Sequence, residues 1–172
     1  MKEQKTQIIE NNLYWAKVKE NAIIPTKTDE NAGYDIYACF DEDYILIYPF
    51  ETISVPTGVA VAVNKDYYLQ VQERGSTGIR GLKYGAGVID SGYRGEIFIV
   101  LTNTNSFPVY IKKIDNAIKY EFPDAVFYPY EKAIAQIVVH KVPKMNVHEV
   151  SYKELLNFES DRKTGVLGSS GK

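Results

Sequence analysis

GAGVIDSGYRGEIFIVLTN, residues 85–103, is the stretch that best indicates the fold of this chain. It holds two runs with strand character, residues 85–89 and 96–103, and the second is rich in β-branched residues. A serine and a glycine, both turn formers, lie between them. The pattern predicts a β-hairpin. Its bend carries an acid, an aromatic ring and a base in the form of Asp90, Tyr93 and Arg94. Taken alone, this stretch is most simply a surface hairpin with Asp90 as a solvated acid.

The same β character continues on both sides of this stretch and predicts an all-β, mostly antiparallel domain. Strands are expected at 13–18, 44–49, 52–63, 67–73 and 132–141, with Pro56 and Gly58 dividing the third of these. A short helix of one or two turns is expected at 151–158, and nothing else suggests a long helix.

Length, charge and composition exclude several classes of protein. A length of 172 residues favours one domain, and a net charge of −2 gives no sequence-independent grip on nucleic acid. The single Cys39 excludes an internal disulfide framework, and with only two histidines a zinc site of the usual kind is not expected. No apolar run is long enough for a bilayer, and the start lacks the apolar core of a signal peptide. We expect a cytoplasmic protein without a membrane or nucleic-acid partner.

Three polar positions outside residues 85–103 are candidates for a site. Asp35, in AGYDIYA (32–38), either caps a turn or requires a partner for its carboxylate. Arg74, followed by GSTG, lies either in an ordinary loop or in an anion cradle of backbone N–H groups, a hydroxyl and a guanidinium. Gln136 interrupts an apolar strand, where an outward-facing amide is the simplest interpretation.

Two further segments lie outside the strands named above. Residues 104–131 form a 28-residue connection rich in aromatic residues, so it is expected to pack or pair, with short strands at 109–111 and 125–128. The glycine- and serine-rich end, residues 162–172, is expected to be a mobile arm. Such an end is either an appended tail or a segment that becomes ordered on a ligand.

Five segments, in this order, resemble the trimeric dUTP diphosphatase (dUTPase) family. They are AGYDIYA (32–38), RGSTG (74–78), GVIDSGYRGEI (87–97), AIAQIVV (133–139) and R-x-x-G-x-x-G-S-S-G (162–171). The resemblance implies a distorted antiparallel β-barrel or jelly roll over residues 1–161, with an inserted segment at about 104–131. It also implies a homotrimer with active sites between subunits and an arm, 162–172, that closes over a site.

The implied activity is hydrolysis of dUTP to dUMP and pyrophosphate with Mg²⁺, which limits uracil in DNA and supplies dUMP. The resemblance makes Asp90 the catalytic base, Tyr93 the ring that packs on deoxyribose, and the backbone of Gly87, Val88 and Ile89 the reader of uracil. The phosphate contacts would come from Arg74, Gly75, Ser76 and Gln136, supported by Asp35, and from the arm residues Arg162, Leu167, Gly168, Ser169 and Ser170. The triphosphate and water would hold Mg²⁺, with no direct protein ligand.

Three features depart from the family pattern. Gly75 stands between Arg74 and Ser76, where a serine usually follows the arginine directly. Leu167 replaces an aromatic residue of the arm, and Val166 replaces a glycine. The 104–131 segment is longer than in most cellular relatives and is similar, in place and length, to an insert of phage dUTPases from Gram-positive hosts. That similarity implies a repressor protein as a possible partner.

Two alternative functions remain beside dUTP hydrolysis. dCTP deaminase shares the fold, but its catalytic glutamate would fall at Val100, which leaves that reaction without its proton shuttle. A regulatory protein-binding role through residues 104–131, with or without catalysis, is the second alternative.

Overall fold

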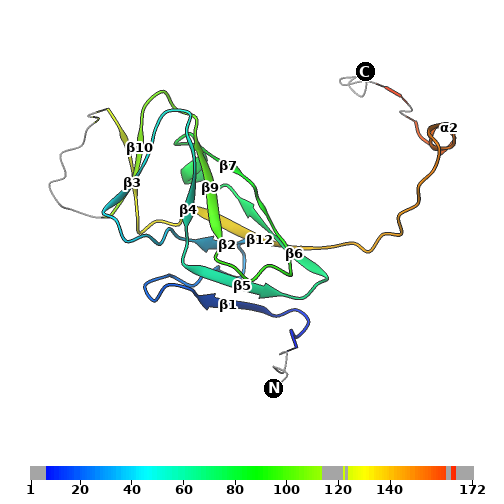
Figure 1. The fold of residues 1–172 in the computed structure, drawn as a ribbon, viewed down its shortest axis with the longest axis horizontal. Coiled ribbons are helices and arrows are strands. Elements are labelled where there is room, and N and C mark those ends of the chain that lie inside the picture. Colours follow the sequence, from blue (N-terminus) through cyan, green and yellow to red (C-terminus); the bar gives the residue numbers. More distant parts are fainter. Residues whose placement is uncertain (1–6, 114–121, 123, 162–163, 166–172) are drawn as a thin grey trace. The chain divides into compact units, whose positions relative to one another are not determined.

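The computed structural model describes residues 7–113, 122, 124–161 and 164–165 (Figure 1). The chain divides into two compact units, residues 1–142 and 143–172. In the second unit, the helix α2 (Tyr152–Leu155) begins where the Ser151 hydroxyl accepts a hydrogen bond from the Glu154 N–H at 3.2 Å. The short helix expected at 151–158 is therefore confirmed. Within the described ranges, no helix has the length and apolar character needed to cross a membrane.

The first unit is built from strands and one short helix. In chain order these are β1 (Leu13–Lys17), β2 (Gly33–Ile36), β3 (Tyr44–Ile47), β4 (Thr52–Pro56), β5 (Val59–Val63), β6 (Tyr67–Gln72), α1 (Gly75–Gly78), β7 (Leu82–Gly85), β8 (Val88–Ile89), β9 (Phe98–Asn103), β10 (Val109–Lys112), β11 (Val126–Pro129) and β12 (Ala135–Lys141). The strands expected from the sequence are confirmed, with β4 and β5 separated where the proline and glycine predicted.

These strands form four small sheets, with the orders β1-β5, β11-β10-β3, β2-β12-β6-β8 and β4-β9-β7. Every pair is antiparallel except β10 with β11. In Figure 1 the β1-β5 pair lies along one side of the first unit, and β3 and β10 lie at another. The predicted all-β, mostly antiparallel class is thus confirmed, while none of the four described sheets closes into a barrel.

The predicted hairpin of residues 85–103 is wrong in its pairing, although its turn exists. The Tyr93 N–H donates to the Asp90 carbonyl oxygen at 3.0 Å, which closes a tight turn. However, β8 pairs with β6, whereas β9 lies between β4 and β7. β9 pairs with β7 (residues 82–85), whereas the two-residue β8 belongs to another sheet. The turn therefore joins two sheets instead of closing one.

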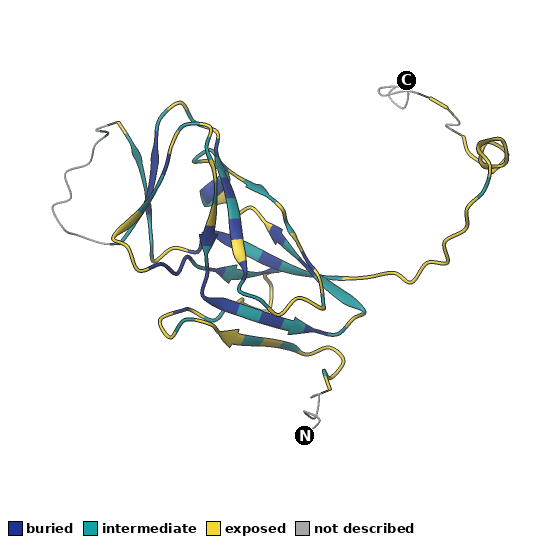
Figure 2. Ribbon diagram, viewed as in Figure 1, coloured by how far each residue is buried: buried dark blue, intermediate teal, exposed yellow. Residues whose placement is uncertain are grey.

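Alternating burial holds the sheets to a common core. β5 alternates strictly between buried and half-buried residues, and β9 does the same after an exposed start. Figure 2 shows this alternation along the strands of the first unit. Most of the buried side chains are aliphatic, and Ile36, Leu69, Leu82, Ile99, Leu101 and Ile137 are all fully buried. At about 25 cal/mol per Å² of apolar surface, this burial is the main source of stability.

The 104–131 segment contains the two short strands that the sequence predicts, β10 and β11. Asn103, fully buried at its start, donates its amide to the carbonyl oxygens of Ile47, Tyr48 and Phe107 at 3.1, 3.1 and 2.9 Å. This contact fixes where the connection leaves β9. Residues 114–121 and 123 lie outside the described residues.

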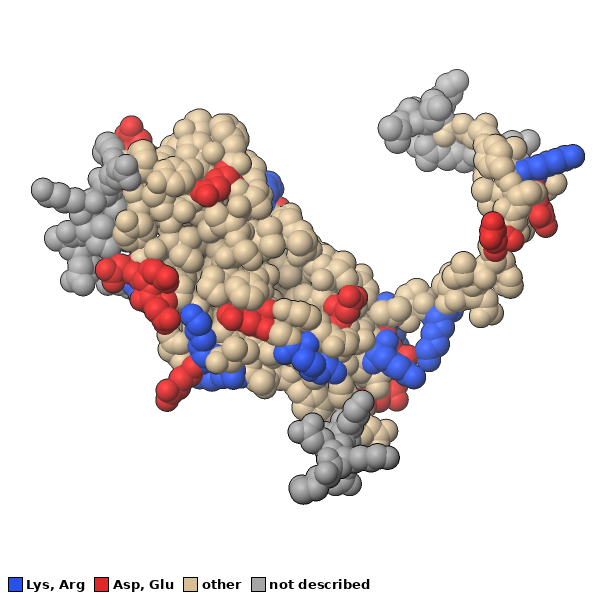
Figure 3. Space-filling model, viewed as in Figure 1, with Lys and Arg blue, Asp and Glu red and all other residues tan. Residues whose placement is uncertain are grey.

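Charges are mixed on the surface of the β-strand unit. On the face drawn in Figure 3, basic and acidic side chains alternate along its lower part and form no single basic area. This agrees with the net charge of −2.

Candidate active site

Three neighbouring strands align two of the candidate residues. Gln136 on β12 lies opposite Asp35 on β2 and opposite Gln72 on β6. Residues directly opposite one another across antiparallel strands share a face and lie within contact distance. The register therefore sets the Asp35 carboxylate beside the Gln136 amide. Arg74 follows β6 by two residues, and so it leaves the sheet at the same end.

Arg74 and Asp35 form a two-point ion pair. The distances are 2.9 Å from Nε to Oδ1 and 3.2 Å from Nη2 to Oδ2. The third nitrogen, Nη1, donates to the Ala133 carbonyl oxygen at 3.0 Å and to the Ser76 hydroxyl at 3.3 Å. Asp35 therefore has the partner that its position requires. The planar guanidinium is held from three sides, with 29% of its side chain still exposed.

RGSTG forms a single helical turn, α1, and not the loop that glycine and serine suggest. Thr77, fully buried, accepts from the Arg74 N–H at 3.3 Å and donates to the Arg74 carbonyl oxygen at 2.9 Å. These bonds secure the start of the turn. Gly75 begins it, and the Ser76 hydroxyl remains within reach of the guanidinium despite the additional glycine.

A cavity of about 320 Å³, here named the arginine cavity, lies among these groups. Its lining residues are Asn31, Ala32, Gly33, Asp35, Arg74, Gly75, Ser76 and Gln136. Gly33 is needed there, because a Cβ at this position would stand 2.6 Å from Gln136 Oε1. The amide is fixed at its other end, where Gln136 Nε2 donates to the Glu73 carbonyl oxygen at 2.8 Å. A cavity with a guanidinium, a hydroxyl and an amide suits an anion.

A second cavity, here named the turn cavity, has a volume of about 250 Å³. It is lined by Ala86, Val88, Ile89, Asp90, Tyr93, Glu96, Ile97, Phe98 and Val100. Asp90 is exposed, so its carboxylate is accessible to water. Tyr93 is 46% exposed, and its hydroxyl donates to the Glu96 carbonyl oxygen at 2.8 Å. A largely apolar wall with two acids, Asp90 and Glu96, and one exposed ring suits a heterocycle and its sugar.

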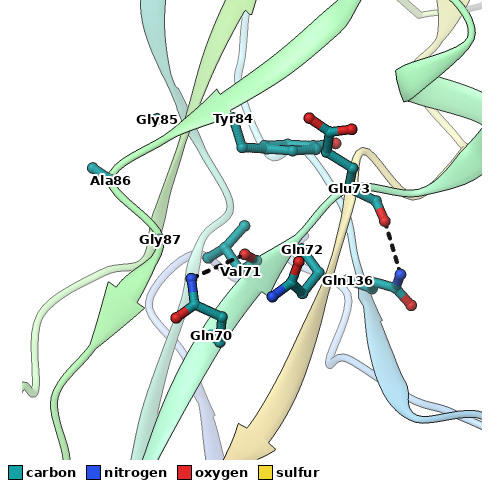
Figure 4. Close-up of a pocket in the computed structure, with 9 residues that line it drawn as sticks. All are labelled: Gln70, Val71, Gln72, Glu73, Tyr84, Gly85, Ala86, Gly87 and Gln136. Atoms are coloured by element: carbon teal, nitrogen blue, oxygen red, sulfur yellow. Dashed lines mark hydrogen bonds between the residues drawn. The ribbon is translucent and has the colours of Figure 1, made fainter. Parts of the chain in front are cut away.

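A third cavity, of about 450 Å³, shares one lining residue with each of the other two cavities (Figure 4). Gln136 also lines the arginine cavity, and Ala86 also lines the turn cavity. The Tyr84 ring stands at its wall, and its hydroxyl contacts the Thr77 hydroxyl at 2.9 Å and the Ile134 carbonyl oxygen. Burial raises the pKa of Tyr84 from 10.0 to about 12, against the opposing effect of the bond to Thr77.

The arginine and turn cavities lie toward opposite ends of β6. β8 runs antiparallel to β6, with Val88 opposite Gln70 and Ile89 opposite Leu69. Asp90 therefore continues toward the start of β6, whereas Arg74 follows its end. From Leu69 to Gln72 the strand already advances by about 10 Å, at 3.4 Å per residue. Within one chain, the Asp90 and Arg74 side chains therefore do not contact the same atom of a ligand.

The structure thus assembles the predicted site residues as two groups. Asp35, Arg74, Gly75, Ser76 and Gln136 surround one cavity, and Val88, Ile89, Asp90 and Tyr93 surround another, with Gly87 in the wall between them. Arg162, Leu167, Gly168, Ser169 and Ser170 lie outside the described residues. In the described part of the chain, no three His, Cys, Asp or Glu side chains gather as a metal site.

Sequence reasoning missed two residues that support these groups, Tyr84 and Glu96. Tyr84 contacts α1 and the residue before β12, and Glu96 accepts a hydrogen bond from the Gly58 N–H at 2.7 Å. Both contacts join residues far apart in sequence. A tyrosine on a predicted strand and a glutamate after a turn carry no local signal of such roles.

Comparison with known proteins identifies relatives over most of the chain. Residues 19–117 match the family model described as dUTPase. A deoxyuridine 5'-triphosphate nucleotidohydrolase of Debaryomyces hansenii is 33% identical over 100% of this chain and 95% of its own length. A Hydrogenobaculum protein of the same name is 32% identical over 90% of this chain and 94% of its own length.

Solved structures share the fold at lower identity. A mutant dUTPase of Staphylococcus bacteriophage 80alpha, bound to dUpNHpp, superposes with a TM-score of 0.77 at 22% identity, over 94% of this chain and 99% of that chain. A mutant dUTPase from phage phi11 of S. aureus, described for its coordination of a structural Mg(II) ion, gives a TM-score of 0.68 over 84% and 99%. These likenesses place the four sheets in the jelly-roll class that the sequence predicted.

Proposed function

Because this chain belongs to the dUTPase family, we propose that it hydrolyses dUTP to dUMP and pyrophosphate with the two groups of residues around the arginine and turn cavities. The observation that carries this proposal is the two-point ion pair of Arg74 with Asp35. It holds an oriented guanidinium beside a hydroxyl and an amide, as binding of a triphosphate requires.

The reaction needs a water molecule in line with the α-phosphorus and a base to orient and deprotonate it. Asp90 is the proposed base: it lies on a tight turn, is exposed to water and faces a cavity of nucleoside size. Its proton gain accompanies formation of the new P–O bond. Pyrophosphate leaves as the bond between the α-phosphorus and the bridging oxygen breaks.

The arginine cavity is proposed to bind the phosphates. Arg74 and the Ser76 hydroxyl supply donors, and Gln136 presents an amide from the neighbouring strand. Mg²⁺ bound to the triphosphate would neutralise charge on the phosphate oxygens.

The turn cavity is proposed to bind the deoxynucleoside. The backbone of Gly87, Val88 and Ile89 would read the uracil edge, and the Tyr93 ring would pack on the deoxyribose. A ring in that place excludes a 2′-hydroxyl, which separates dUTP from UTP. At the position where a dCTP deaminase would carry its catalytic glutamate, this cavity is lined by Val100, and this supports dUTP hydrolysis over deamination of dCTP.

We propose a homotrimer with shared sites, and the separation of the two groups supports this. Asp90 and Arg74 lie toward opposite ends of β6, and this separation favours a site to which two chains contribute. A second copy would supply the missing half, and the arm residues 162–172 would close over the substrate. The phage relatives solved with dUpNHpp support a substrate of this type.

The test of the activity is pyrophosphate release from dUTP, dCTP, dTTP and UTP with Mg²⁺. We expect rapid release from dUTP and little from the others. Ammonia release from dCTP, or equal rates with all four nucleotides, would contradict the proposal.

Mixing two inactive variants tests the shared site. Asp90→Asn and Arg74→Ala trimers, dissociated and reassembled together, should regain part of the activity, because some sites then combine two intact halves. If both halves acted within one chain, no mixture would recover activity.

We also propose a regulatory protein-binding role for the 104–131 segment. Its described part presents β11 as the edge strand of a sheet, and edge strands are common binding sites for partners. A phage 80alpha dUTPase with the same fold is described as controlling transfer of virulence genes. Deletion of the 104–131 segment, which includes β11, should abolish binding to a phage-type repressor and preserve hydrolysis; equal repressor binding by the deletion variant would refute this role.

A further inference from the structure

The turn that carries Asp90 and Tyr93 is fastened at its far end to the bend between β4 and β5. Three hydrogen bonds make this connection. Gly58 N–H donates to Glu96 Oε1 at 2.7 Å, Ile97 N–H donates to the Val59 carbonyl oxygen at 2.9 Å, and the Thr57 hydroxyl donates to the Ile97 carbonyl oxygen at 2.6 Å. Thr57 and Gly58 are both buried. The end of the turn is therefore clamped to the core.

The Tyr93 ring is directed onto this same clamp. Its hydroxyl donates to the Glu96 carbonyl oxygen at 2.8 Å. Gly95 leaves the space that this requires, because a Cβ there would stand 2.5 Å from the Tyr93 hydroxyl oxygen and 2.7 Å from Cζ. The ring thus folds back over Gly95 and ends on the backbone of Glu96. Its position depends on where that backbone lies.

Glu96 takes part both in the hydrogen bonds of the clamp and in the contact with the Tyr93 hydroxyl. Its side chain fixes the clamp, its carbonyl oxygen fixes the ring, and it lines the turn cavity with Asp90. A carboxylate is a strong acceptor for a buried N–H. Without it, the Gly58 N–H would be buried and unpaired, and only the two hydrogen bonds through Ile97 would still hold the segment, so the backbone at Glu96 would shift.

Resting on the proposed function, we propose that Glu96 is a positioning residue that sets the discrimination between deoxyribose and ribose by holding the Tyr93 ring in place. Glu96 acts through the ring and takes no part in the chemical step. Its loss therefore moves the ring away from the sugar and creates room for a 2′-hydroxyl.

The test compares kcat/KM for dUTP and for UTP in three glutamate variants. Glu96→Ala should lower the ratio of the two values by roughly tenfold or more, through weaker dUTP binding and better acceptance of UTP. Glu96→Gln keeps an oxygen acceptor for Gly58 and should restore most of the ratio. Glu51→Ala is the matched control, because Glu51 Oε2 accepts the Tyr48 N–H at the same 2.7 Å in a turn outside the site.

Tyr93→Phe gives a second measurement that does not disturb the clamp, which matters if Glu96→Ala folds poorly. It removes only the hydroxyl that meets Glu96, and it should lower the same ratio. Unchanged ratios in folded Glu96→Ala and in Tyr93→Phe would overturn the inference. A wild-type protein that releases no pyrophosphate from dUTP would instead contradict the proposed function itself.

Discussion

The Arg74 guanidinium grips the Asp35 carboxylate at two points, across the ends of two strands that are not neighbours in their sheet. β12 lies between β2 and β6, and Gln136 occupies the intervening position. One acid, one amide and one guanidinium therefore form a row. Changing the acid should affect the orientation of the guanidinium before it affects the fold, because both side chains are partly exposed.

Asp35→Asn should raise KM for dUTP by roughly tenfold or more, since a charged hydrogen-bond partner of Arg74 is lost. Steady-state kinetics of pyrophosphate release measure the change. Asp41→Asn is the control: it breaks the exposed Lys19–Asp41 pair at 3.5 Å, a surface contact of little energetic value. Equal KM values in the two variants would show that Asp35 does not support the phosphate site.

Asp90→Asn should lower kcat by on the order of 10²- to 10⁴-fold, because the base is removed while the shape of the turn is kept. Binding of dUpNHpp, followed by calorimetry, should stay close to that of the wild type. A variant with normal turnover would remove Asp90 from the mechanism. Loss of dUpNHpp binding would instead assign Asp90 to substrate binding.

Gly33→Ala should lower kcat/KM for dUTP, because the new Cβ would collide with Gln136 Oε1 and displace the amide from the arginine cavity. Ala16→Gly, at an exposed position of β1 outside both cavities, should leave kcat/KM unchanged. Kinetics and thermal unfolding of both variants separate the site effect from a loss of stability. Unaltered kinetics in a folded Gly33→Ala protein would mean that Gln136 is dispensable.

Tyr84 makes stability depend on pH at the alkaline end. Burial disfavours the ionised ring, so its pKa rises from 10.0 in the unfolded chain to about 12 in the fold. The unfolded state then loses this proton first, and stability present below pH 10 is lost as the pH rises toward 12. Tyr84→Phe cannot titrate. Its stability deficit against the wild type, measured by denaturant unfolding, should therefore shrink between pH 10 and 12, and a constant deficit would contradict the assignment.

Truncation after Asp161 tests the arm that the sequence resemblance implies. Removal of Arg162 and the glycine- and serine-rich end should strongly lower kcat/KM for dUTP, because donors to the terminal phosphates are lost. The oligomer, measured by light scattering, should remain intact. Full activity in the truncated protein would identify these residues as an appended tail.

Local sequence signals predicted most strands, because alternation and turn residues act within a few positions. They failed on the pairing of residues 85–103, since a turn does not determine which strand each arm will meet. β8 is only two residues long, and the free edge of β6, far back in the sequence, takes it up. Nor does GSTG predict a helix by propensity: α1 forms because Thr77 and Tyr84 secure its start.

The residues of the candidate site likewise fall into those that could be predicted from the sequence and those that could not. Residues with unusual chemistry, such as Asp90 and Arg74, could be selected from the sequence once several segments supported one another. Tyr84 and Glu96 could not, because each acts through a backbone or hydroxyl group brought near by folding. Their side chains are ordinary for a strand and for a turn.

The arginine and turn cavities have no lining residue in common. With the roles proposed above, recognition of the nucleoside and binding of the triphosphate therefore depend on different residues. During evolution a lineage can exchange the base it accepts without rebuilding its hold on the phosphates. For inhibitor design, the same separation means that a fragment for each cavity can be optimised independently and the two joined afterwards.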